Sequence, residues 1–224
     1  MKTVYLIRHA AAVERESFLK DQERPLSDKG REESKNMAKR FKQQVTTPEI
    51  WISSHAKRAL ETAYIFADIF GIPNKQLIVN KKIYDESTGS RLLSILQNLE
   101  EPMKSCVLFG HEPTLSEFAA YLVSRYHTPL PKTGILGIVL PSSKWAHIEP
   151  SQGLIKTVLF PDNEKLAYEL QKKSLKTAFY EKNLELLCLF DEKVATDLEN
   201  TVAKYSGKLV KKVFKRLKEN EAGS

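Results

Sequence analysis

The sequence has little that would cross-link the chain or insert it into a membrane. Only two of its 224 residues are cysteines, Cys106 and Cys188, and both lie in apolar stretches. Cysteines in such settings are typical of reduced core residues, so no disulfide framework is predicted. No apolar run approaches the roughly 20 residues that a membrane-spanning helix needs. The N-terminus also lacks the charged-then-apolar pattern of a secretory leader. We therefore expect a cytoplasmic protein.

Several familiar chemical motifs are missing as well. The sequence has no Asp and His cluster with the spacing of metal ligands, no lysine-containing phosphate loop of the Walker type and no GxGxxG. It contains no internal repeat and no low-complexity stretch. We therefore expect chemistry without a metal or a cofactor.

The charge distribution argues against a nucleic-acid partner. The net charge is +7, with 42% hydrophobic and 28% charged residues, which is typical of a globular protein with a proper core. Basic residues crowd the far C-terminus, and the other positive groups stand singly at strand and helix ends. The first 160 residues show no basic stripe interleaved with aromatic residues, the pattern expected of a nucleic-acid surface.

Strand and helix patterns alternate over about the first 130 residues. This alternation predicts an α/β fold with a mostly parallel central sheet and helices on both faces. Ser27 suits the N-cap of the first helix, and Gly71 suits the residue that ends the second. Strands are expected at Thr3–Arg8, Glu49–Ser53, Gln76–Val79 and Ser105–Phe109. Helices are expected from Ser27 to about Gln43, from Lys57 to Phe70, from Gly89 or Ser90 to Leu99, and from Pro113 to Tyr126.

The pattern changes after this alternating part. Three further strands joined by short turns, a hairpin-rich edge of the sheet, are expected at Gly134–Leu140, Trp145–Glu149 and Leu154–Phe160. Pro161 marks a boundary, so the chain is divided into a domain of residues 1–162 and a helical basic extension of residues 163–224.

The extension contains an amphipathic basic helix near its end. Its apolar positions, which fall on one side, are Leu209, Val210, Val213, Phe214 and Leu217. Such a helix can dock on a membrane surface, an acidic partner or another subunit. Alternatively, its apolar face packs on the rest of the chain while its lysines stay solvated.

The first strand ends in two polar side chains. Arg8 and His9 follow the apolar run Val4–Ile7 directly. Ligands of open α/β sheets bind outside the carboxyl ends of the strands, so this pair indicates an anion site that contains a nitrogen nucleophile. The alternative is a strand that simply ends in solvated residues.

Two later strand ends repeat this pattern. Arg58 falls in the first turn of a helix, where the helix dipole disfavours a cation unless an anion is bound nearby. His111 follows Gly110 between a strand end and a helix N-terminus, which is a favourable place for phosphate. A solvent-directed Arg58 and a His111 that only caps or packs at its turn are the alternatives.

Two arginines and two histidines at one sheet edge suit phosphoryl transfer. Arginine presents a planar fork that matches phosphoryl oxygens. A histidine nitrogen can attack phosphorus and divide the reaction into two easier steps. The remaining positive groups would stabilise the charge of the transferred group.

Four stretches of residues 1–160 resemble one known family. They are Leu6–Ala10, Arg24–Gly30, Ser53-Ser54 with Arg58-Ala59 and Thr62-Ala63, and Leu108–Pro113. In order and spacing they look like the histidine phosphatase (phosphoglycerate mutase-like) superfamily, and most like its SixA-type phosphohistidine phosphatases. Pro131–Gly134 suits that branch too. The resemblance implies a three-layer fold with a mostly parallel central sheet. It also implies that His9 is the nucleophile and that Arg8, Arg58 and His111 complete the phosphate pocket.

The sequence departs from the wider family at two points. Ala10 stands where glycine is commoner, and the only candidates for a carboxylic general acid are Asp85 and Glu86. These two are either the acid or ordinary loop residues. An alcohol leaving group needs such an acid, whereas the P–N bond of a phosphoramidate is labile and needs little help. The short connection Ala10–Arg24 also offers little material for a lid, which favours an open site.

The sequence therefore predicts a phosphatase that forms phosphohistidine on His9 and dephosphorylates phosphohistidine on a protein, such as a phosphorelay component. Two alternatives remain. One is a phosphatase of a small phosphate ester, and the other is a non-catalytic phosphate-binding module whose helical tail recruits a partner.

Overall fold

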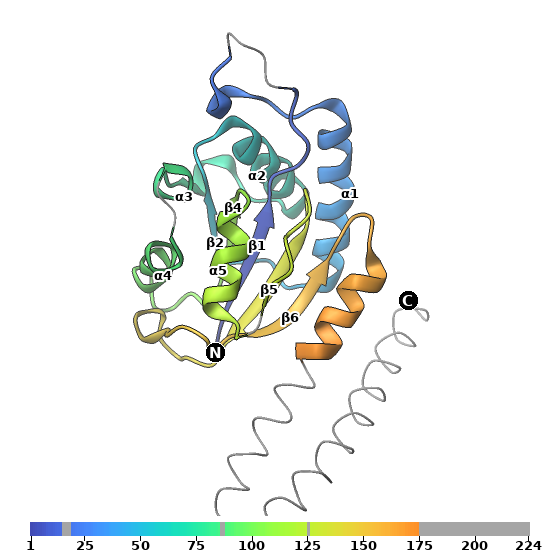
Figure 1. The fold of residues 1–224 in the computed structure, drawn as a ribbon. Coiled ribbons are helices and arrows are strands. Elements are labelled where there is room, and N and C mark those ends of the chain that lie inside the picture. The colour runs from blue at the N-terminus through green and yellow to red at the C-terminus, as the bar shows by residue number, and fades with distance from the viewer. Residues whose placement is uncertain (15–18, 86–87, 125, 175–224) are drawn as a thin grey trace, which may run out of the picture. The chain divides into compact units, whose positions relative to one another are not determined.

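The computed structural model describes residues 1–14, 19–85, 88–124 and 126–174. The chain divides into two units, and the first, residues 1–164, is built on one six-stranded sheet (Figure 1). The strands run in the order β3-β2-β4-β1-β5-β6. Strands β1, β2, β3 and β4 form only parallel pairs with one another. On the other side of β1, β5 pairs antiparallel with β1, and β6 pairs antiparallel with β5. The bounds are β1 (Lys2–Arg8), β2 (Ile50–Ser53), β3 (Leu77–Val79), β4 (Ser105–Gly110), β5 (Ile135–Leu140) and β6 (Leu154–Leu159).

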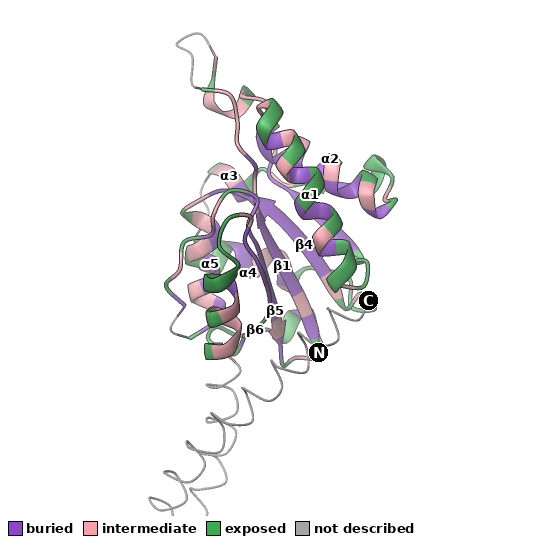
Figure 2. Cartoon of the chain, turned by 90° about the vertical axis from the view of Figure 1, so that its right-hand side faces the viewer, coloured by how far each residue is buried: buried purple, intermediate pink, exposed green. Residues whose placement is uncertain are grey.

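Helices cover both faces of this sheet, as Figure 2 shows. Helices α1 and α2 pack together on one face, and α4 and α5 pack together on the other. The expectation of a three-layer α/β fold with a mostly parallel sheet is confirmed. The helical elements are η1 (Asp21–Glu23), α1 (Asp28–Gln44), α2 (Lys57–Phe70), η2 (Asn74–Gln76), α3 (Lys82–Asp85), α4 (Gly89–Gln97), α5 (Thr114–Leu122) and η3 (Trp145–His147).

The central strands are apolar on both faces because both faces are covered. In β1, Tyr5 and Ile7 join the aromatic cluster under α1 and α2, whereas Val4 and Leu6 are fully buried on the alternate positions of the strand. Phe41 of α1 is the centre of that cluster, with its ring 5.0 Å from the ring of Tyr5. A buried parallel strand of this kind is a rigid support for whatever follows its last residue.

The two helices that flank the site begin and end as their sequences predict. The Ser27 hydroxyl accepts a hydrogen bond from the backbone N–H of Gly30 and caps α1. Helix α2 ends at Gly71, whose φ of 74° is the left-handed conformation that glycine adopts without strain. These caps fix where each helix starts and stops relative to the strand ends.

Two predicted elements differ from the structure. The strand predicted at Trp145–Glu149 is wrong, because this stretch forms the short helix η3. Its apolar pattern comes from the burial of Trp145, whose indole N–H donates to the carbonyl of Met103. Helix α5 ends at Leu122 rather than at Tyr126, because the carbonyls of Tyr121 and Leu122 accept hydrogen bonds from Ser151 and Gly153.

The second unit comprises residues 165–224. Residues 164–174 are helical, as the sequence predicts. The amphipathic segment around Leu209–Leu217, as well as Cys188, lies outside the described residues. Within the described ranges no helix combines the length and apolar character needed to cross a membrane.

The close approach of α1 to the chain after β1 predicts a sensitive position. A Cβ at Gly30 would collide with the carbonyl oxygen of Ala11, a backbone atom that also accepts hydrogen bonds from the N–H and hydroxyl of Ser27. We expect Gly30→Ala to lower the free energy of unfolding by about 1–3 kcal/mol, the range typical of overpacking. Urea unfolding measures this change. Lys39→Ala, at an exposed position of the same helix, is the matched control, and equal stabilities of the two variants would contradict the close contact.

Candidate active site

The site lies where three parallel strands end side by side. Arg8 at the end of β1 is level with Gly110 of β4, and Ser53 of β2 is level with Phe109. The backbone N–H of His9 continues this pairing by donating to the carbonyl of Gly110 at 3.0 Å. Residues His9, His111 and Ser54 therefore follow neighbouring strands and meet at one edge of the sheet.

The side chain of His9 is held in one tautomer. Its Nδ1 lies 2.7 Å from the carbonyl oxygen of Ala10, which can only accept, so Nδ1 carries the proton. Its Nε2 accepts a hydrogen bond of 3.1 Å from the Nε–H of Arg58. The lone pair of the imidazole is therefore on Nε2, next to a guanidinium group.

The surroundings of His9 keep its ring neutral. Burial, together with the charges of Arg58, Arg8 and Lys132, lowers its pKa to about 4, against the opposing effect of the hydrogen bond to Ala10. Burial also lowers the pKa of His111, with further lowering by His9 and Arg58. An uncharged imidazole keeps its nitrogen lone pair available at neutral pH.

Arg58 is buried under the site instead of pointing into solvent. It lies in the first turn of α2 and is 7% exposed. Besides His9, its guanidinium donates to the backbone carbonyl of Asp21 at 2.6 Å and to the Asp21 carboxylate at 2.9 Å. The carbonyl of Arg58 accepts from the Thr62 hydroxyl, which in turn accepts from the N–H of Ala10, so α2 is tied to the residue after His9.

His111 lies beside His9 on the same edge, with the two ring centroids 5.0 Å apart. Its Nε2 pairs with the Ser54 hydroxyl at 2.8 Å, and its buried Nδ1 has no partner among the described residues. The ring of Tyr84, from α3, stands edge-on at 5.1 Å. His111 is thus fixed through one nitrogen, and its second nitrogen is unpaired beside His9.

Arg8, the last residue of β1, adds a second cation near His9. Its Nη1 donates to the carbonyl of Leu130 at 2.9 Å, and its buried Nε has no partner in the described part of the chain. Burial lowers its pKa, and the charge of Glu112 opposes this shift. Glu112 accepts a hydrogen bond from Ser116, whose hydroxyl also binds the N–H of Leu130, so this carboxylate braces the segment that anchors Arg8.

Asp21 is a member of the site that the sequence does not reveal. Burial would raise the pKa of its carboxyl, but hydrogen bonds from Arg24 and Tyr84 and the charge of Arg58 hold that pKa far below its usual value. Arg24 also donates twice to the carbonyl of Val13, which clamps the connection between β1 and α1. The short connection therefore contributes a charged group to the site, although no motif singles out Asp21.

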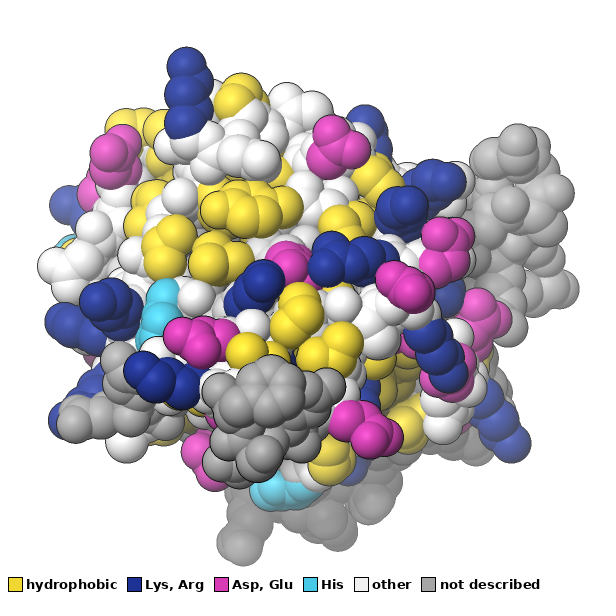
Figure 3. All heavy atoms as spheres, turned by 90° about the horizontal axis from the view of Figure 1, so that it is seen from above, with side chains coloured by type: hydrophobic (Ala, Val, Ile, Leu, Met, Phe, Trp, Pro, Cys, Tyr) yellow, Lys and Arg dark blue, Asp and Glu magenta, His cyan; other side chains and the backbone are white. Residues whose placement is uncertain are grey.

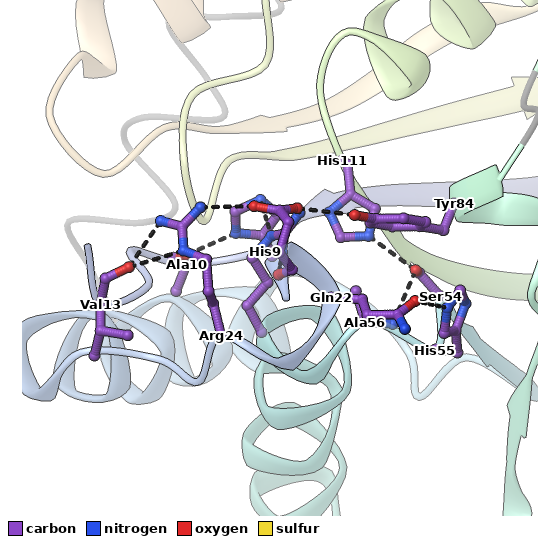
Figure 4. A network of polar contacts seen from close by, with 12 residues as sticks. His9, Ala10, Val13, Gln22, Arg24, Ser54, His55, Ala56, Tyr84 and His111 are labelled. Carbon is purple, nitrogen blue, oxygen red and sulfur yellow. Dashed lines mark hydrogen bonds and ion pairs between the residues drawn. The ribbon is translucent and has the colours of Figure 1, made fainter. Parts of the chain in front are cut away.

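Figure 4 shows this network at close range, with His9 and His111 between Arg24 on one side and Ser54 and Tyr84 on the other. Looking down on the edge of the sheet, Figure 3 shows Lys or Arg side chains next to an Asp or Glu side chain near the centre of the face. The arrangement provides cationic donors for an anion and a nitrogen lone pair among them. This is a combination that can bind a phosphoryl group and accept it covalently.

The structure thus brings together Arg8, His9, Arg58 and His111, the four residues singled out by their positions after strands and at a helix start. It does not decide the roles of Asp85 and Glu86, because Glu86 and the side chain of Asp85 lie outside the described residues. Their neighbour Tyr84 is in the site and donates from its hydroxyl to Asp21 at 2.8 Å.

Comparison with known proteins places the chain in a family. The model of the histidine phosphatase superfamily (branch 1) matches residues 4–79. An uncharacterized protein of Picosynechococcus sp. is 32% identical over 139 residues, which are 60% of this chain and 83% of that protein.

Two solved structures share the fold. The protein histidine phosphatase SixA, in complex with tungstate, is 24% identical, with a TM-score of 0.62 over 73% of this chain and 99% of SixA. A mycobacterial glucosyl-3-phosphoglycerate phosphatase is 14% identical, with a TM-score of 0.54 over 70% of this chain and 97% of that enzyme. The strand ends, the family model and the relative agree: this chain belongs to the histidine phosphatase superfamily.

Proposed function

We propose that this protein is a phosphatase that forms a phosphohistidine intermediate on His9 and acts on phosphohistidine of a protein. The observation that carries the proposal is the fixed tautomer of His9, whose Nδ1–H is bound to the Ala10 carbonyl and whose Nε2 lone pair faces the guanidinium of Arg58. Membership of the superfamily and the shared fold with SixA support it.

In the first step the Nε2 lone pair of His9 attacks phosphorus. The new P–N bond forms as the P–N bond of the substrate breaks, and its electron pair leaves with the substrate nitrogen. The guanidinium N–H that binds Nε2 in the free protein turns to a phosphoryl oxygen, with Arg8 and His111 as further donors. The proton on Nδ1 of His9 stays where the Ala10 carbonyl holds it.

In the second step a water molecule attacks the phosphorus of phospho-His9. The bond to Nε2 breaks, its electron pair returns to the imidazole, and the protons of the water pass to the phosphate and the solvent. His9 is restored in its starting tautomer because the same carbonyl still holds the Nδ1 proton. The positive groups stabilise the charge on the transferred phosphoryl group in both steps.

The carboxylates in the described part of the site favour a leaving group that needs no protein acid. Asp21 is held ionised by Arg24, Tyr84 and Arg58, so it has no proton to donate near neutral pH. Burial raises the pKa of Glu112, but its carboxylate accepts from the Ser116 hydroxyl and braces the segment that anchors Arg8, so we assign it a supporting role rather than proton donation. A phosphoramidate leaves without such an acid, whereas an alkyl phosphate ester depends on one.

Phosphate release from a phosphohistidine-bearing protein tests the reaction and its nucleophile together. We expect release by the natural chain and a loss of at least about 10³-fold in His9→Ala, because the covalent step then has no acceptor. His147→Ala, at an exposed position of η3, is the matched control and should retain activity. Turnover of a small phosphate ester while the phosphohistidine protein is untouched would favour the ester phosphatase, and no release from any substrate would favour a binding module.

The double variant Asp85→Asn/Glu86→Gln separates the two substrate classes. We expect it to keep the activity on a phosphoramidate, because the proposed substrate leaves without a general acid. A selective loss on an alkyl phosphate ester, about 10²–10⁴-fold, would assign one of these residues as the acid of an ester phosphatase. Steady-state kinetics on both substrates measures the difference.

The tautomer of His9 predicts its titration. Because its pKa is lowered to about 4, the ring should stay neutral from pH 8 down to about pH 5 and gain a proton only near pH 4. The ¹⁵N shifts of the imidazole, assigned with His9→Asn, report both the proton on Nδ1 and the pKa. Titration of His9 near 6.5, the value of a solvated histidine, would contradict the proposed neutral nucleophile.

A further inference from the structure

Asp21 places a negative charge inside a site built for anions. Its carboxylate is bound by three donors from three parts of the chain: Arg24 at 2.9 Å, Arg58 at 2.9 Å and the Tyr84 hydroxyl at 2.8 Å. A carboxylate in this position repels a phosphate group and lowers affinity for it. If Asp21 only held Arg58 in place, its side chain could be buried. Instead, the Asp21 side chain is one-third exposed.

The carboxylate and the nitrogen of His9 face the same space. Arg58 binds Nε2 of His9 through its Nε and binds Oδ2 of Asp21 through its Nη2. These two nitrogens form one edge of the planar guanidinium, so the groups that they bind lie next to each other along that edge. A phosphoryl group placed on Nε2 therefore has Asp21 as a neighbour.

Asp21 also has room for one more donor. A carboxylate offers about four acceptor positions, and the described contacts use one on Oδ1 and two on Oδ2. The remaining acceptor position is on Oδ1. Since the carboxyl is ionised, it can accept an N–H but cannot supply a proton.

We infer that Asp21 is a specificity-determining residue that accepts the N–H of a positively charged nitrogen leaving group. This inference rests on the proposed function and names its substrate class more closely, as N-phosphorylated bases. A phosphoimidazole ring that is protonated on its second nitrogen is a cation, and it leaves as neutral imidazole when the electron pair of the P–N bond returns to its first nitrogen. Asp21 stabilises the protonated ring while His9 forms the new P–N bond, and no proton passes to the protein.

The same carboxylate disfavours esters. The oxygen of a phosphate ester gains negative charge as it leaves, and it carries no N–H for Oδ1. Asp21 therefore separates the two substrate classes by charge, at the cost of weaker binding of free phosphate.

Asp21→Asn tests the inference by a ratio of activities. This variant keeps the size of the side chain and removes its charge. We expect kcat/KM for phosphoimidazole to fall about tenfold or more beyond any fall for p-nitrophenyl phosphate, as lost hydrogen bonds to charged groups typically do. Inhibition by inorganic phosphate should become stronger. Glu23→Gln, an equal charge change at an exposed position of the same short helix η1, should leave the ratio unchanged.

Tyr84→Phe distinguishes the effect of the Asp21 charge from the effect of losing a hydrogen bond in the network around it. It removes one hydrogen bond to Asp21 but keeps the carboxylate, so it should change both activities in parallel. Equal losses on both substrates in Asp21→Asn would overturn the inference and leave Asp21 as a positioning residue for Arg58. A natural chain that cleaves p-nitrophenyl phosphate but not phosphoimidazole would overturn the proposed function, and the inference with it.

Discussion

The parallel pairing of β1 with β4, and of β4 with β2, is the constraint on which the site depends. The carboxyl ends of parallel strands lie at the same edge of a sheet, so the residues that follow these strands gather there without any long loop. His9, Ser54 and His111 are brought together in this way, although they are far apart in the sequence. The buried aliphatic residues of the strands fix the register, and the register fixes which side chains meet.

Burying positive charge at this edge of the sheet is unfavourable, and neighbouring carbonyl and carboxylate groups offset that cost. Arg58 donates to a backbone carbonyl and to the carboxylate of Asp21, whereas Arg8 donates to the carbonyl of Leu130 and feels the charge of Glu112. Their charges, together with burial, keep His9 neutral. The site therefore holds a neutral nucleophile among cations, of which Arg58 is paired with Asp21.

The sequence predicts the part of this arrangement that follows from periodicity and position. Arg8 and His9 are recognisable because an apolar run stops at them, and Arg58 because a cation at a helix start is unfavourable. Asp21 and Tyr84 carry no such signal, because they lie in the short helices η1 and α3 and only their tertiary contacts place them in the site. The strand predicted at Trp145–Glu149 is wrong for a related reason, because one large buried side chain, Trp145, gives this stretch the apolar character of a strand.

The antiparallel strand β5 approaches the site from the opposite direction to its neighbours, and the segment before it is joined to the site through peptide groups. Arg8 donates to the carbonyls of Leu130 and Gly134, and the N–H of Thr133 points to the carbonyl of His9. Contacts made by peptide groups do not depend on the side chains beside them. The exposed Lys132 can therefore be exchanged, and with it what the segment presents to a substrate, without loosening the arginine that the segment holds, whereas Gly134 is fixed because a Cβ there would lie 2.8 Å from Pro131.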